Sequence, residues 1–131
     1  MKDLFICFLH ITPENSTFSQ SNVDQFENLN HDILSYYDKG DILLCGDFNG
    51  RVLTLQEFVV NDSDSRNWID DNEYCIDNCR IRSSLDNVLT GRGRHKIDLC
   101  VESRLRILNG RTLGDLQGNY TFHNSQGSSA I

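Results

Sequence analysis

The sequence predicts an α/β domain that contains a strand–helix–strand unit. Residues 4–11 are apolar except for His10, which is typical of a buried strand. Residues 21–39 place apolar side chains at the three- and four-residue spacing of one helix face. Residues 41–46 begin with an acid and continue as a second apolar run. Because a helix separates the two runs, we expect them to form parallel neighbouring strands.

Both ends of the expected helix carry signals of their own. Ser21 and Asp24 approximate a capping box, in which side chains bond the free N–H groups of the first turn. Gly40 follows Lys39, at the place where a glycine commonly ends a helix. We therefore expect the helix to begin at Ser21 and to end at Lys39.

The remainder of the chain predicts shorter elements. Residues 52–60 fit a short helix or a strand, and both alternatives stay open. Residues 61–79 are acidic and rich in Asn, which predicts a long surface loop. Irregular chain is expected over 80–94, with a turn at Gly91-Arg92-Gly93-Arg94. The pattern then predicts the following elements: a helix over 95–103 and strands over 105–109, 119–123 and 127–131.

The second apolar run ends in the sequence Gly46-Asp47-Phe48-Asn49-Gly50. Residues two apart on an extended chain point to the same side, so Asp47 and Asn49 should project together while Phe48 points into the core. Ligands of open α/β sheets bind at this carboxyl edge. A carboxylate beside a carboxamide suits water activation and phosphate positioning. The alternative is an Asp/Asn-rich turn without chemistry.

The composition limits the classes of protein to which the chain can belong. The chain has 131 residues, which allows one domain, and its hydrophobic content of 38% indicates a globular protein. The net charge is −7, yet residues 78–111 carry 8 basic and 3 acidic side chains. Nine of the twelve basic residues are Arg, which favours bidentate phosphate contacts. This basic segment is either a surface for a polyanion or a solvated helix face.

The cysteines favour reduced thiols. Cys7 and Cys45 lie in apolar runs and are expected to be core thiols. Cys75, Cys79 and Cys100 remain, but with His95 they do not match a common zinc spacing. The first apolar run is too short for a signal peptide, and no stretch is long enough to span a membrane. We therefore expect an intracellular protein that does not insert into membranes.

Three segments in this order resemble the endonuclease/exonuclease/phosphatase superfamily, and in particular its retrotransposon-type (LINE-like) endonuclease branch. They are ILLCGDFNGRV at 42–52, KIDLCVESRLRILNGRTLGD at 96–115 and GNYTFHNSQGSSAI at 118–131. The resemblance implies a four-layer α/β sandwich, in which two mixed sheets pack face to face between helices. It also implies hydrolysis of phosphodiester bonds in DNA with Mg²⁺ or Mn²⁺, and a reverse transcriptase domain as a partner in the full-length protein.

The resemblance assigns roles to individual residues. Asp47 would orient or deprotonate the attacking water, and Asn49 would hydrogen-bond that assembly and the phosphate. His10 stands where the family has a Tyr at a strand end, so this position departs from the family pattern. Asn119, Thr121 and Ser129 would contact the nucleic acid, although Thr121 and Ser129 are equally well explained as ordinary strand hydroxyls.

The resemblance also implies that this chain covers only the middle of the family's domain. The metal-binding Glu would precede residue 1, an Asp would follow Ile131, and the terminal Asp-His pair would lie further on. We therefore expect a partial sandwich, incomplete at both ends and inactive as an isolated chain, with no metal ligands of its own. Two alternatives remain open. One is a non-catalytic remnant or binding module, and the other is a superfamily phosphatase that acts on a small phosphoester.

Overall fold

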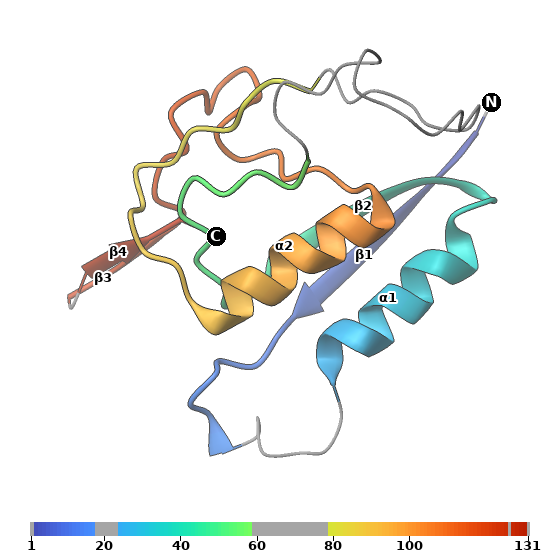
Figure 1. The fold of residues 1–131 in the computed structure, drawn as a ribbon, viewed down its shortest axis with the longest axis horizontal. Coiled ribbons are helices and arrows are strands. Elements are labelled where there is room, and N and C mark those ends of the chain that lie inside the picture. The colour runs from blue at the N-terminus through green and yellow to red at the C-terminus, as the bar shows by residue number, and fades with distance from the viewer. Residues whose placement is uncertain (1, 18–23, 59–78, 126, 131) are drawn as a thin grey trace, which may run out of the picture.

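The structure is a computed structural model that describes residues 2–17, 24–58, 79–125 and 127–130. Its elements, shown in Figure 1, are β1 (Asp3–His10), α1 (Gln25–Tyr36), β2 (Gly40–Asp47), α2 (Gly91–Ser103), β3 (Phe122–Asn124) and β4 (Gly127–Ser129). The strands form two small sheets, β1–β2 and β3–β4. The predicted α/β class is confirmed at this level. No helix in the described ranges is long and apolar enough to cross a membrane.

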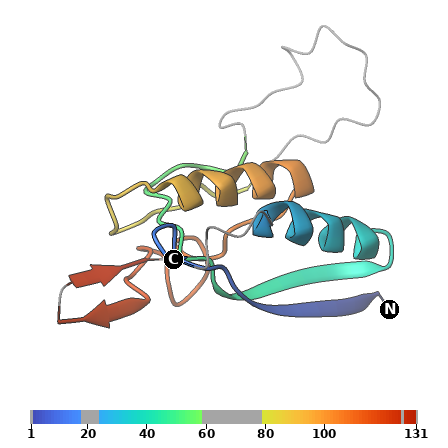
Figure 2. The same cartoon turned by 90° about the horizontal axis from the view of Figure 1, so that it is seen from below.

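β1 and β2 lie side by side as parallel strands, as the strand–helix–strand pattern predicts. The register pairs Asp3 with Gly40 at one end and His10 with Asp47 at the other. Figure 2 shows α1 and α2 on the same side of this sheet. The carboxyl ends of both strands therefore meet at one edge, and the helices cover one face.

The helix α1 is shorter than the sequence predicts. Asp24 caps it, because one oxygen of its side chain accepts hydrogen bonds from the N–H groups of Phe26 at 2.9 Å and Glu27 at 3.3 Å. Ser21, the predicted cap, lies outside the described residues. The helix ends at Tyr36, whose carbonyl oxygen accepts a bond from the Lys39 N–H at 2.9 Å and closes a turn before β2.

One apolar cluster joins both helices to the covered face of the sheet. Its buried members are Ile11, Phe26, Leu29, Ile33, Phe48 and Leu99. The predicted burial of Phe48 is therefore confirmed. Cys7 is half-buried and packs against the cluster, and Cys45 is also only half-buried. The two thiols are thus less enclosed than the apolar runs around them predict.

The opposite face of β1 is apolar and exposed. Leu4, Ile6 and Phe8 have exposed fractions of 59%, 51% and 82%. Parallel sheets are usually covered on both faces, because their connecting helices and neighbouring sheets pack there. No described element covers this face, so the described part of the chain presents one sheet with helices on one side of it.

The helix α2 begins four residues earlier than predicted, and the turn expected at Gly91-Arg92-Gly93-Arg94 is wrong. These residues form the first turn of the helix. The hydroxyl of Thr90 caps it by accepting a bond from the Gly93 N–H at 3.1 Å. A side chain at Gly93 would collide with the carbonyl oxygen of Arg51. Glycine is therefore needed here for close packing inside a helix, not for a turn.

The strand predicted over 105–109 does not form. The N–H of Ile107 donates to Oε1 of Glu57 at 2.8 Å, so a buried side chain takes the place of a neighbouring strand. Residues 52–58 likewise form neither helix nor strand beyond an isolated bridge between Val52 and Leu89. The loop predicted at 61–79 lies outside the described residues except for Cys79.

A short antiparallel hairpin closes the described chain. β3 and β4 pair from Phe122 with Ser129 to Asn124 with Gly127. The strands predicted over 119–123 and 127–131 are therefore present but shifted or shortened. The Thr121 N–H adds one further bond to the carbonyl oxygen of Ser129 at 3.0 Å.

The core position Ile33 and its exposed neighbour Leu34 provide a matched pair, with exposed fractions of 2% and 60%. Ile33→Ala should lower the free energy of unfolding by about 3 kcal/mol, because it leaves a cavity between α1 and the sheet. Leu34→Ala should change it by less than about 0.5 kcal/mol. Urea denaturation followed by circular dichroism measures both, and equal losses would contradict this packing.

Candidate functional site

The structure brings His10, Asp47 and Asn49 to the carboxyl edge of the β1–β2 sheet. His10 and Asp47 are register partners at the ends of the two strands. The N–H of Ile11 donates to the Asp47 carbonyl oxygen at 2.8 Å and holds the two ends together. Because register partners on neighbouring strands point to the same side, the His10 and Asp47 side chains share one face.

The turn after β2 fixes the Asp47 carboxylate. Its Oδ1 accepts a hydrogen bond from the Asn49 N–H at 2.7 Å. The Asn49 Nδ2 donates to the Ile11 carbonyl oxygen at 2.8 Å, and Asn49 adopts a left-handed φ of 46°. No described residue donates a hydrogen bond to Oδ2 of Asp47. One carboxylate oxygen is thus held by the turn, and the other is available to a ligand or water.

An ion pair between Arg51 and the buried carboxylate of Asp86 positions the loop that follows this turn. Arg51 donates to Asp86 through Nε and Nη2, both at 2.7 Å. Asp86 is 1% exposed and also accepts bonds from the N–H groups of Val88 and Ala130, each at 3.0 Å. Burial acts to raise the pKa of Asp86, but the bonds from Arg51, Ala130 and Val88 outweigh it and hold that pKa below its ordinary value.

The three expected substrate contacts fall in different settings. Thr121 and Ser129 lie together at the base of the hairpin, joined by their backbone bond, and Thr121 also lines a cavity beside β2. Ala130, next to Ser129, is the residue that bonds Asp86. Asn119 is engaged elsewhere, since its N–H and Nδ2 donate to Asp115 at 2.8 and 2.9 Å.

Lys96 is a further candidate that the sequence analysis did not identify. It is 4% exposed, and its Nζ lies 4.7 Å from the centroid of the Phe48 ring. Burial lowers its pKa to about 8. Its spacing in the sequence could have indicated its burial, because Lys96 lies on the same face of α2 as the buried residues Gly93, Ile97 and Cys100. Burial also raises the pKa of Cys100 to about 11.

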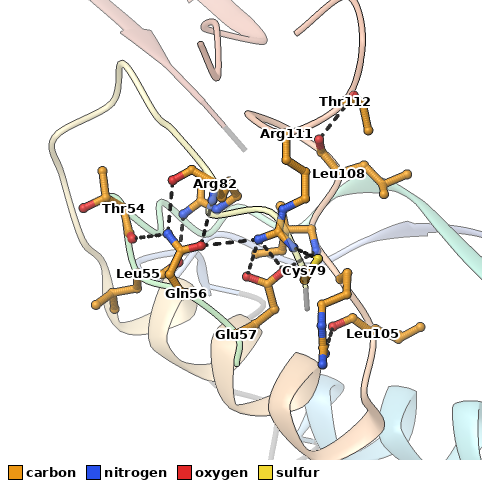
Figure 3. A network of polar contacts seen from close by, with 12 residues as sticks. Thr54, Leu55, Gln56, Glu57, Cys79, Arg82, Leu105, Leu108, Arg111 and Thr112 are labelled. Carbon is orange, nitrogen blue, oxygen red and sulfur yellow. Dashed lines mark hydrogen bonds and ion pairs between the residues drawn. The ribbon is translucent and has the colours of Figure 1, made fainter. Parts of the chain in front are cut away.

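Part of the basic segment is internal. Glu57 is 1% exposed and pairs with Arg111, whose Nη2 lies 2.9 Å from Oε1 and 3.1 Å from Oε2 (Figure 3). Arg82 is also buried, and its Nη2 donates to the carbonyl oxygens of Leu53 and Leu55. These two arginines therefore hold loops together and are not part of a surface for a polyanion.

The described residues do not assemble a metal site. No group of three or more His, Cys, Asp or Glu side chains is gathered within these ranges. Cys79 accepts a hydrogen bond from Arg111 Nη1 at 2.9 Å, and His95 packs edge-on against the Phe26 ring. Cys75 lies outside the described residues. The donor set that is present does not by itself fit Mg²⁺ or Mn²⁺.

The Asp86 ion pair yields a stability prediction. Asp86→Asn should lower the free energy of unfolding by roughly 2–4 kcal/mol at pH 7, because Arg51 loses its charged partner. Asp98→Asn, at an exposed position of α2, is the control and should be nearly neutral. The folded pKa of Asp86 is depressed, so its contribution is full above the unfolded pKa and is lost as pH falls through the folded one.

Urea denaturation at pH 7 and between pH 4 and 2, at roughly the range where carboxyl groups titrate, measures this contribution. The difference between the wild type and Asp86→Asn should shrink as the pH falls. A difference that is absent at pH 7, or that stays constant down to pH 2, would show that the pair does not stabilise the fold.

Lys96 yields a second pH prediction, in the alkaline range. The folded state releases the Lys96 proton near pH 8, whereas the unfolded chain keeps it to about pH 10.5. The unfolded state binds more protons than the folded state in this window, so the free energy of unfolding of the wild type rises with pH. Lys96→Met should therefore be more stable than the wild type at pH 7, and the gap should narrow between pH 8 and 10.5.

The exposed Lys39 supplies the matched control, since Lys39→Met should show no gap that varies with pH. Urea denaturation in steps of half a pH unit measures the three proteins side by side. A constant gap for Lys96→Met would mean that the ammonium is not destabilised in the folded state.

Comparisons with protein-family models, with curated proteins and with solved structures found no significant match. The resemblance to the endonuclease/exonuclease/phosphatase superfamily thus rests on the sequence segments that carry it, and the geometry above is the basis for a proposal about function.

Proposed function

We propose that this chain forms part of a divalent-metal-dependent phosphodiesterase, most similar to a retroelement-type DNA endonuclease. The observation that carries the proposal is the placement of Asp47, Asn49 and His10 at the shared carboxyl edge of two parallel strands, where ligands of α/β sheets bind. The superfamily resemblance supplies the substrate class, and a reverse transcriptase partner rests on that resemblance alone.

The geometry supports a division of roles. Asp47 keeps Oδ2 available while the Asn49 N–H fixes Oδ1, so the carboxylate can orient and deprotonate a water for in-line attack on phosphorus. Asn49 uses one N–H of Nδ2 to bind Ile11, which leaves its second N–H for the phosphate. His10 is exposed on the same face as Asp47 and can donate a hydrogen bond to a phosphate oxygen.

A divalent metal would supply charge stabilisation at the phosphate. The described residues do not fit this metal on their own, since they gather no set of three ligands. Its ligands would have to come from residues outside the described ranges or from a partner. The roles proposed for Asp47, Asn49 and His10 involve the water and the phosphate and not the metal.

The exposed face of β1 supports the four-layer sandwich as part of the proposal. Leu4, Ile6 and Phe8 form an apolar row on the face opposite the helices. A second sheet packed there would bury this row and would give the layer order of helix, sheet, sheet and helix. The His10 and Asp47 side chains would then lie at the end of the sandwich, where the two sheets open to solvent.

A binding module is the second candidate. The described residues lack a metal-ligating group of three, which favours a chain that keeps the fold segment but performs no chemistry. A phosphatase for a small phosphoester is a third possibility, and the resemblance of the segment at 118–131 to the DNA-acting branch disfavours it.

Nicking of supercoiled plasmid DNA with Mg²⁺, by the protein expressed from its complete transcript, tests the proposal. Asp47→Asn should reduce the rate by about 10²–10⁴-fold, because the general base is lost. Asp41→Asn, an exposed change on the same strand, should leave the rate unaltered. Equal rates for the wild type and Asp47→Asn would remove Asp47 from the chemistry. A wild type that binds the plasmid without nicking it would indicate the binding module.

A further inference from the structure

A cavity of about 560 Å³ lies beside β2. Its walls come from residues 42–46 of β2, from Lys96 and Cys100 of α2, and from residues 104–109. α2 and the chain that follows it thus share this cavity with β2, although they are distant in sequence. The volume falls in the range of cavities that hold small organic ligands, roughly 300–1,000 Å³.

The charge of the cavity wall has one sign. Lys96, Arg104 and Arg106 line it, and no Asp or Glu does. Lys96 is 4% exposed, and no described acid forms an ion pair with it. Burial together with Arg82 lowers its pKa, and Glu57 and Asp47 act to raise it only at longer range. Its Nζ lies over the face of the Phe48 ring. A buried ammonium without a paired acid is costly, and an anion in the cavity would offset that cost.

The rest of the wall is mainly apolar. Ile42, Leu44 and Phe48 form one side, and Leu105 and Ile107 contribute from the segment after α2. A small inorganic anion would pair with Lys96 but would leave this surface in contact with water. An apolar compound would cover the surface but would leave Lys96 unpaired. The combination therefore selects a ligand that has both an anionic head and an apolar body.

We propose that this cavity binds a small amphipathic carboxylate whose head group pairs with Lys96 and whose aliphatic or aromatic tail lies against the apolar wall. Asp47, Asn49 and His10 do not line the cavity, so it is separate from the proposed water activation, although Thr121, an expected substrate contact, does line it. The cavity is nevertheless adjacent to Asp47, since Gly46 and Phe48 on either side of Asp47 line it. An occupant would thus contact the backbone that positions the candidate site.

Octanoate is the probe, and isothermal titration calorimetry at pH 7 with the purified chain is the measurement. We expect a Kd on the order of 0.1–1 mM, from the ligand efficiency of small organic molecules. Octanol should bind at least tenfold more weakly, because it offers the same tail without the charge. Lys96→Met should weaken octanoate binding at least tenfold and should remove the preference for octanoate over octanol.

Lys39→Met is the matched control, because it makes the same chemical change at an exposed position outside the cavity and should leave the Kd unchanged. Leu108→Glu is a second variant, at a cavity residue that is 50% exposed and tolerant of a polar side chain. The added carboxylate should weaken octanoate binding five- to tenfold and should leave octanol binding unaltered.

Three results would overturn the proposal. Octanol could bind as tightly as octanoate, or Lys96→Met could leave octanoate binding unchanged, and in either case Lys96 would not select an anion. Inorganic phosphate at equal concentration could displace octanoate, in which case the cavity would be a general anion site and the apolar wall would not contribute. None of these results depends on whether the protein cleaves DNA.

Discussion

The bidentate ion pair between Arg51 and Asp86 holds the parts of this structure that are distant in sequence. The Asp86 carboxylate accepts four hydrogen bonds, two from Arg51 and one each from Val88 and Ala130. The Arg51 N–H also donates to the hydroxyl of Thr90, the residue that caps α2, and the Thr90 N–H donates to the Arg51 carbonyl oxygen. A buried carboxylate is stable only when its oxygens are satisfied in this way. The loop after β2, the start of α2 and the end of the hairpin therefore depend on one acid.

The parts of the fold that the sequence predicts well are those that local pattern decides. β1, α1 and β2 follow from periodic apolar residues, and their parallel pairing follows from the helix between them. The neighbourhood of Asp47 and Asn49 follows likewise from their spacing of two residues, with Asp47 at the end of β2 and Asn49 in the turn after it. Asp86 and Lys96 were not foreseen, because each acquires its role from partners in other segments. Asp86 lies 35 residues from Arg51 and 44 from Ala130.

Two predicted elements fail for a related physical reason. Gly91 and Gly93 indicate a turn when only their neighbours are considered, but the Thr90 cap and the close approach of Arg51 to Gly93 place them in a helix. Residues 105–109 alternate as a strand should, yet the Ile107 N–H is satisfied by Glu57, which lies 50 residues away. In the first case a local cap and the close approach of a distant segment favour the helix, and in the second a distant side chain satisfies the backbone that a strand neighbour would otherwise satisfy. Such contacts leave no periodic trace in a single sequence.

The cations of residues 78–111 show why charge along a sequence is a weak guide to a surface. Arg82 and Arg111 are buried and bind carbonyl oxygens and Glu57. Lys96 faces a cavity, and Arg94 and Arg104 remain exposed. Long-range attraction of a nucleic acid would depend on the exposed charges alone, because buried ones are already neutralised or screened from solvent. Lys96 differs from both groups, since it is buried without a paired acid and Glu57 and Asp47 act on it only at longer range. An anion in the cavity, as proposed above, would offset the cost of this charge, and in its absence the lowered pKa favours the neutral amine as the pH rises above about 8.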